Sequence, residues 1–118
     1  MTTRIWTVRL SAAAEADYQQ ILRWTVKNFG SSQARVYANT LSSALTALHA
    51  GPEIIGAKLR DDIGHHIRTL HVARNGNKGR HFVMFRVSTV QGQPVIDVLR
   101  LLHDGMDPQR HVPPTQAD

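Results

Sequence analysis

Three arginines, Arg68, Arg86 and Arg100, have the clearest capacity for chemistry in this sequence. Each carries a planar guanidinium group, which can bind phosphate or carboxylate groups through paired hydrogen bonds, and each falls in a segment predicted to be a β-strand. On a sheet face without helices, the three side chains would line a basic groove. The sequence thus predicts a surface for an anionic partner, with Arg110 as a further candidate. Taken singly, each arginine could instead be solvated or ion-paired.

His103 closes the last predicted strand and could act as a general acid or base, because histidine titrates near neutral pH. The turn that follows contains Asp104 and Asp107. A structural role, in which His103 hydrogen-bonds this turn through one of the two aspartates, is the interpretation we favour.

The chain contains seven histidines and no cysteine, which raises the question of a metal site. His65 and His66 are adjacent, so on a strand they would point apart. His71, His81 and His111 have no acidic or thiolate companions at the spacing that metal ligands require. The sequence therefore predicts no metal and no cofactor.

Arg23 and Lys27 lie one helical turn apart on the first predicted helix, opposite its apolar stripe. Such a pair is ordinarily solvated surface. If the two cations have a function, contact with a protein partner is the expected one.

Two helices with almost no linker are predicted between residues 11 and 51. Ser11 is the expected N-cap of the first, Gly30 its C-terminal end, and Ser31 the cap of the second. The buried stripe predicted for the first helix consists of Ala14, Tyr18, Ile21, Leu22, Thr25 and Phe29, and the one for the second consists of Ala34, Tyr37, Leu41, Ala44, Leu45 and Leu48. Trp6 and Trp24 are also expected in the core.

Strands are predicted at residues 5–10, 66–73, 80–88 and 94–103, with residues 53–64 as a loop. The expected fold is α+β: an N-terminal strand, an antiparallel two-helix hairpin and a three-stranded antiparallel meander, with the hairpin on one face of an antiparallel sheet. The strand at 80–88 is apolar on both sides, so both sheet faces are partly covered or one carries a site. Residues 1–112 are expected to form a single domain and 113–118 a mobile tail.

Composition narrows the functional class. The chain has 118 residues and a formal net charge of +5, which suits one compact domain with a polyanionic or acidic partner. A chain without cysteine has no disulfide bonds and suits the reducing environment of the cytoplasm. The N-terminus lacks the apolar core of a signal peptide, and no stretch is long and apolar enough for a membrane span.

Segment 98–111, with the sequence VLRLLHDGMDPQRH, resembles the closing motif of ParE toxins within the wider RelE/ParE superfamily. Similar stretches are VRLSAAAEAD at 8–17, IRTLHV at 67–72 and RHFVMFRV at 80–87. Together they span nearly all of residues 5–112 in the family's order. The sequence departs from the pattern at residues 73–79, a connection that is longer and more basic than the tight hairpin usual there.

The resemblance implies a cytoplasmic toxin of a type II toxin–antitoxin system that is not an enzyme and inhibits DNA gyrase by binding it. It also implies a ParD-like antitoxin, whose ribbon-helix-helix half binds DNA and whose flexible tail wraps the toxin. The toxin itself then needs no sequence-specific contact with DNA. If the chain is such a toxin, Arg23 and Lys27 are candidates for antitoxin binding. The candidates for target binding are Arg68, Arg86, Arg100 and Arg110.

The superfamily offers two alternatives. One is a metal-independent, ribosome-dependent endoribonuclease of the RelE branch, with Arg68, Arg86 and His103 around the scissile phosphate. In that branch a His or Tyr near this end takes part in cleavage, but no tyrosine follows His103, since Tyr18 and Tyr37 both lie on predicted helix stripes. The other alternative is a non-toxic homologue that only binds antitoxin.

Overall fold

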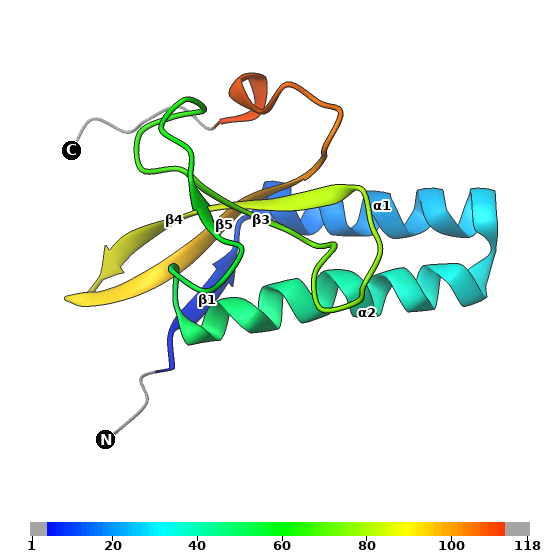
Figure 1. Cartoon of the computed structure of the whole chain (residues 1–118), viewed down its shortest axis with the longest axis horizontal. Helices are drawn as coiled ribbons and strands as arrows, with labels where there is room; N and C mark the ends of the chain where they lie inside the picture. The colour runs from blue at the N-terminus through cyan, green and yellow to red at the C-terminus, as the bar shows by residue number, and fades with distance from the viewer. Residues whose placement is uncertain (1–4, 113–118) are drawn as a thin grey trace.

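A computed structural model describes residues 5–112 as a helical hairpin packed on a five-stranded sheet (Figure 1). The α+β class predicted from the sequence is confirmed. The predicted tail at 113–118 lies outside the described residues. In chain order the elements are β1 (Thr7–Leu10), α1 (Ala12–Phe29), α2 (Ser31–Ala47), the 3-10 helix η1 (Leu48–Ala50), β2 (Lys58–Leu59), β3 (Arg68–His71), β4 (His81–Val90), β5 (Gln93–His103) and the 3-10 helix η2 (Pro108–His111).

The start of α1 follows the predicted capping. The side chain of Ser11 accepts a hydrogen bond from the backbone N–H of Ala14, which satisfies a donor that the first helical turn leaves free. Gly30 ends α1 with a φ of 92°, a conformation that favours glycine. The predicted cap at Ser31 is wrong: α2 already begins at Ser31, and Gly30 occupies the N-cap position without a side-chain hydrogen bond.

The sheet has the strand order β1-β5-β4-β3-β2. The predicted meander forms, since β3, β4 and β5 pair antiparallel in sequence. A fully antiparallel sheet is wrong, however, because β1 pairs parallel to β5, with Thr7 opposite Val95. The period-two pattern that predicts a strand carries no information about its neighbour or direction. The loop predicted at 53–64 also contains the two-residue edge strand β2, which is too short to show a period.

Both faces of the sheet carry a core. The larger one lies under the helices and joins α2 to the sheet through Leu41, Leu48, Leu70, Phe85 and Ile96. A smaller cluster on the opposite face is formed by Ile63, Ile67, Phe82, Met84, Leu99 and Leu102. The two apolar faces predicted for the strand at 80–88 are therefore both partly covered, one by the helices and the other by residues of the 60–67 loop.

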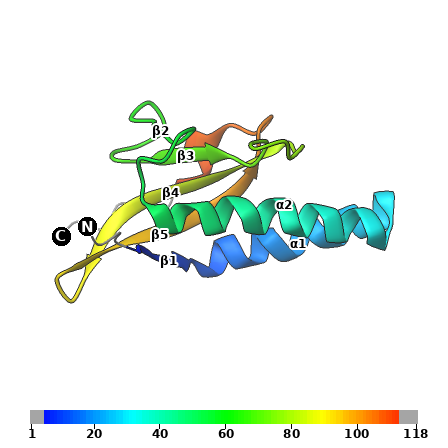
Figure 2. The ribbon, with the colours of Figure 1, turned by 60° about the horizontal axis from the view of Figure 1, so that its bottom comes forward.

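The helical hairpin extends past the end of the sheet (Figure 2). The last turns of α1 and the first turns of α2 consequently have each other as neighbours but no strand beneath them. Neither described helix is long and apolar enough to cross a membrane.

Candidate functional site

A cleft of about 620 Å³ opens where the overhanging end of the hairpin meets the connection between β3 and β4. Its apolar side is formed by Trp24 and Phe29 of α1 and Val36 of α2. Its other side is polar and consists of Tyr37, the backbone and side chains of residues 76–80, His81 and His103. The cleft thus combines apolar surface with cationic and imidazole groups.

The apolar side of the cleft is unusually exposed. Trp24 is 59% exposed and Phe29 63%, with their rings edge to face and the centroids 5.6 Å apart. Both were predicted to be buried, and both predictions are wrong for the same reason: the sheet ends before these turns of α1, so no strand covers them. Exposed aromatic and aliphatic side chains grouped in this way are typical of a protein-binding surface.

The polar side is centred on a hydrogen bond of 2.6 Å between the Tyr37 hydroxyl and Nδ1 of His81. The same hydroxyl accepts a hydrogen bond from the backbone N–H of Arg80 at 3.2 Å, and its own proton is available for the bond to the imidazole. Burial, reinforced by the neighbouring His103, lowers the pKa of His81 to about 4. His81 is therefore neutral at pH 7. Burial also raises the pKa of the Tyr37 hydroxyl.

His103 lies beside His81, with ring centroids 5.4 Å apart. Its Nδ1 accepts the backbone N–H of Gly105 at 3.0 Å and lies 3.8 Å from a carboxylate oxygen of Asp104. His103 thus contacts its own turn, but its hydrogen bond there is with the backbone of Gly105 and not with Asp104 or Asp107 as predicted. Asp107, the other partner considered, instead caps η2 by accepting the backbone N–H of Gln109.

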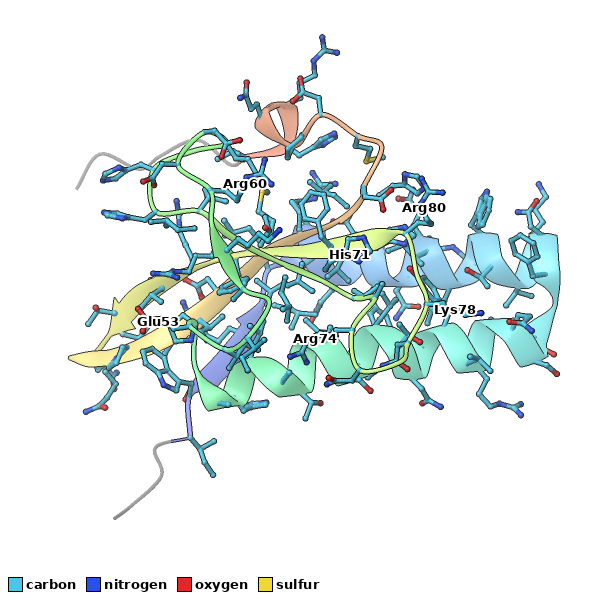
Figure 3. All side chains as sticks on the ribbon, viewed as in Figure 1. Glu53, Arg60, His71, Arg74, Lys78 and Arg80 are labelled. Carbon is cyan, nitrogen blue, oxygen red and sulfur yellow. The ribbon has the colours of Figure 1, made fainter. Side chains whose placement is uncertain are left out.

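Asp104 fastens the ends of the strands together. Its carboxylate accepts hydrogen bonds from Nε2 of His71 at 3.0 Å and from Nε of Arg80 at 3.2 Å. Its backbone N–H donates a hydrogen bond to the carbonyl of Arg80. The hydrogen bond from His71, followed by that from Arg80, lowers the pKa of Asp104. This group of side chains holds the end of the connection between β3 and β4 against the end of β5. Figure 3 labels two of its members, His71 and Arg80.

The three strand arginines do not converge. Arg68 pairs in register with Phe85, whose side chain lies in the core under the helices, so Arg68 points to that face and lies 3.9 Å from Glu53. Arg86 follows Phe85 directly and points to the opposite face, where no side-chain hydrogen bond or ion pair holds it among residues 5–112. The predicted groove of all three is therefore not formed, because strand residues of opposite parity lie on opposite faces.

Arg100 is tied to α1. Its guanidinium donates two hydrogen bonds to the carboxylate of Asp17, at 2.7 and 2.8 Å, and only 25% of its side chain is exposed. Near its other side lies Nδ1 of His111, at 3.4 Å.

The remaining candidates lie on the surface. Arg110 in η2 is well exposed and 3.6 Å from Asp107. Arg23 and Lys27 are exposed on α1 and line no part of the cleft. His65 and His66, predicted to point apart, instead lie side by side with ring centroids 3.7 Å apart and the rings tilted by 47°, because they precede β3 and His66 has a left-handed φ of 60°.

Sequence reasoning missed the cleft and two of its residues, His81 and Tyr37. The two lie 44 positions apart in the chain, and no local pattern indicates that they share a hydrogen bond. The high density of glycine and asparagine at 75–79 was the one available signal, since it predicted the turn that forms one wall.

Comparison with known proteins agrees with this fold. The family model described as "ParE toxin of type II toxin-antitoxin system, parDE" matches residues 8–108. Toxin ParE1 of Mycobacterium tuberculosis, from strains CDC 1551 and H37Rv, is 33% identical over 103 residues, which cover 87% of this chain and 94% of the relative. A solved structure described as the chromosomal ParDE TA system from P. aeruginosa matches with a TM-score of 0.64 at 20% identity, covering 85% of this chain and 97% of that one. The chain therefore belongs to the ParE toxin family of type II toxin–antitoxin systems.

Proposed function

We propose that this toxin inhibits DNA gyrase by binding it directly, in the cytoplasm, and that a ParD-like antitoxin with a ribbon-helix-helix domain neutralises it. The observation that carries a binding function is the cleft, whose exposed Trp24, Phe29 and Val36 offer apolar surface to a macromolecular partner. Such a toxin is not an enzyme, and it needs neither a cofactor nor sequence-specific contact with DNA.

The placement of the proposed nuclease residues favours binding over RNA cleavage. Phosphoryl transfer requires its catalytic groups around one phosphate. His103 pairs with His81 at the start of β4, whereas Arg68 pairs with Phe85 four residues further along, a separation of roughly 13 Å at about 3.3 Å per residue. Arg86 is on the opposite face of the sheet. One phosphate therefore does not reach Arg68, Arg86 and His103 together.

Different candidate residues suit the target and the antitoxin. For gyrase, Arg86 offers a guanidinium group without a bound carboxylate among the described residues, and Arg110 offers a well exposed one beside Asp107. Arg100 is already engaged by Asp17, and Arg68, which is less exposed than Arg110, lies 3.9 Å from Glu53. For the antitoxin, Arg23 and Lys27 stay candidates on the outer face of α1. The cleft adds apolar surface, which a flexible antitoxin tail needs in order to bind tightly.

The test is to incubate the purified toxin with gyrase, ATP and supercoiled plasmid, and to denature the protein before electrophoresis. Linear plasmid is the expected product, because a toxin that stalls gyrase on cleaved DNA leaves both strands broken. Adding the antitoxin in equimolar amount should abolish it. Folded toxin that halts growth yet yields no linear DNA would contradict the gyrase proposal and favour mRNA cleavage on the ribosome.

A further inference from the structure

The connection at residues 73–80, between β3 and β4, borders a hollow on each side of it. Residues 76–80 form one wall of the cleft described above. Arg74, Asn75 and Asn77 border a second hollow of about 430 Å³, whose other wall is polar surface of α2. The residues of α2 there are Asn39, Ser42, Ser43, Thr46 and Ala47. Figure 3 shows Arg74 and Lys78 on opposite limbs of the connection.

The connection is held in place at several points. A Cβ on Gly79 would lie 2.8 Å from the ring of Tyr37 and 2.7 Å from Val72, so only glycine permits this close approach to α2. The Tyr37 hydroxyl also accepts the backbone N–H of Arg80, and the Arg74 guanidinium donates to the carbonyl of Ile55 at 3.2 Å. The backbone that carries the cations of the connection is consequently held in place, which lowers the entropy lost when a partner binds.

The charges on the two hollows have one sign. Lys78 and Arg80 line the cleft and Arg74 lines the polar hollow, while no carboxylate lines either one in the part of the chain that the structure describes. Arg80 is engaged by Asp104, but Lys78 is exposed and has no ion pair within residues 5–112. A complementary partner therefore carries carboxylates together with the apolar side chains that fit against Trp24, Phe29 and Val36.

We propose that residues 73–80 form the antitoxin-recognition loop of this toxin, and that its occupant is an acidic, amphipathic segment of the antitoxin. The apolar side chains of that segment fill the cleft, and Asp or Glu side chains beside them pair with Lys78 and, across the loop, with Arg74. The inference rests on the proposed function, since it requires that an antitoxin neutralises this chain.

The test compares two lysines of similar exposure. Lys78 lies at the cleft, whereas Lys58, on β2, lines neither hollow. The probe is the purified product of the ribbon-helix-helix reading frame that neighbours the toxin gene, and affinity is measured by calorimetry at two salt concentrations. We expect Lys78→Glu to weaken binding about tenfold or more at low salt and Lys58→Glu to leave it within about twofold. Replacing the facing antitoxin carboxylate with lysine should restore the affinity of Lys78→Glu.

The outcomes separate the two proposals. Equal affinities of the Lys78→Glu and Lys58→Glu toxins, with tight binding by the unaltered toxin, would overturn the recognition loop and leave neutralisation by antitoxin intact. Failure of the unaltered toxin to bind would overturn both. Circular dichroism melting of each variant checks that the fold is retained.

Discussion

The carboxylate of Asp17 on α1 receives two hydrogen bonds from the guanidinium of Arg100 on β5, and one of its oxygens also accepts the backbone N–H of Leu101 at 3.0 Å. Asp17 is buried, with only 8% of its surface exposed. Just before it, the Ser11 hydroxyl donates to the carbonyl of Leu99. Beyond the end of β1, side chains at the start of α1 therefore form hydrogen bonds with the backbone groups on this edge of β5. Arg100 is consequently part of the structure that holds helix and sheet together.

We expect Arg100→Ala to lower the free energy of unfolding by about 2–3 kcal/mol, because it leaves the Asp17 carboxylate buried without its cation. Hydrogen bonding to Asp17 also raises the pKa of Arg100, so the guanidinium keeps its positive charge. Urea denaturation followed by circular dichroism measures the change. The double replacement Arg100→Ala with Asp17→Asn should recover part of it, and an unchanged stability of Arg100→Ala would show that the pair contributes nothing.

Arg86→Ala is the cleaner test of target binding, since Arg86 holds no carboxylate within the described residues. We expect its free energy of unfolding to stay within about 0.5 kcal/mol of the original. In the gyrase assay it should need a clearly higher toxin concentration to give the same amount of linear plasmid. Undiminished gyrase poisoning by this variant would remove Arg86 from the target surface, and Arg110→Ala would then be the next replacement.

The neutral His81 makes stability depend on pH. Its folded-state pKa of about 4 lies below the ordinary 6.5, so between these values the unfolded chain binds more protons than the folded one. Stability is therefore full above pH 6.5 and falls as the pH drops towards 4. His103 and His71 strengthen the shift, whereas Asp104 and Asp17 oppose it.

After allowance for solvent screening of this half-buried group, we expect His81 to account for about 1–2 kcal/mol of the loss between pH 7 and pH 4. The variant His81→Asn retains an acceptor for the Tyr37 hydroxyl but cannot titrate. Denaturation curves at the two pH values should show a smaller loss for this variant. Identical losses for the two proteins would mean that His81 is protonated in the folded state as readily as in the unfolded one.

Gly79→Ala should destabilise the toxin by about 1–3 kcal/mol, because the added methyl group meets Tyr37 and Val72 at less than 3 Å. Gly76→Asn is the matched control on the same loop. No atom lies within 4 Å of its Cβ position, and asparagine tolerates the φ of 84° found there. The melting temperatures of the two variants should differ by several degrees. Equal melting temperatures would show that the loop can shift to accommodate the methyl group without loss of stability.

Trp24→Ser should leave stability nearly unchanged, since the side chain is 59% exposed, yet weaken antitoxin binding by about 2 kcal/mol, or roughly thirtyfold. Val26→Ser offers a control on the same helix, because Val26 is 48% exposed but does not line the cleft. Calorimetric titration with the antitoxin gives both affinities. Equal effects of the two replacements would argue against the cleft as the binding surface.

The sequence predicted those parts of the fold that local patterns determine. The Ser11 cap, the glycine between the helices and the three strands of the meander all follow from interactions over a few residues. The parallel neighbour of β1 does not, because alternation along a strand does not specify the direction of the strand beside it. The partner of β1 depends on which edge strand of the sheet, here β5, the rest of the chain places beside it.

The candidate site was less predictable, for a related reason. The spacing of Phe29 in its helix indicates a buried face, but it cannot indicate that the sheet ends before the last turns of that helix. Likewise Arg68 and Arg86 each suit an anion site, and only the register of β3 against β4 shows that they point to opposite faces. Residue types thus identified plausible chemistry, while the extent and register of the strands decided which groups meet.

The parallel pairing of β1 with β5 also has a consequence for the time at which the toxin becomes competent. Thr7 opposes Val95, so β1 finds its neighbour only after residues up to Val95 have left the ribosome. At about 5–20 residues per second, synthesis of the segment between the two takes roughly 4–18 s, and such distant pairing also folds slowly. We expect the nascent chain to stay harmless during synthesis, which gives an antitoxin made alongside it time to be present when the sheet closes.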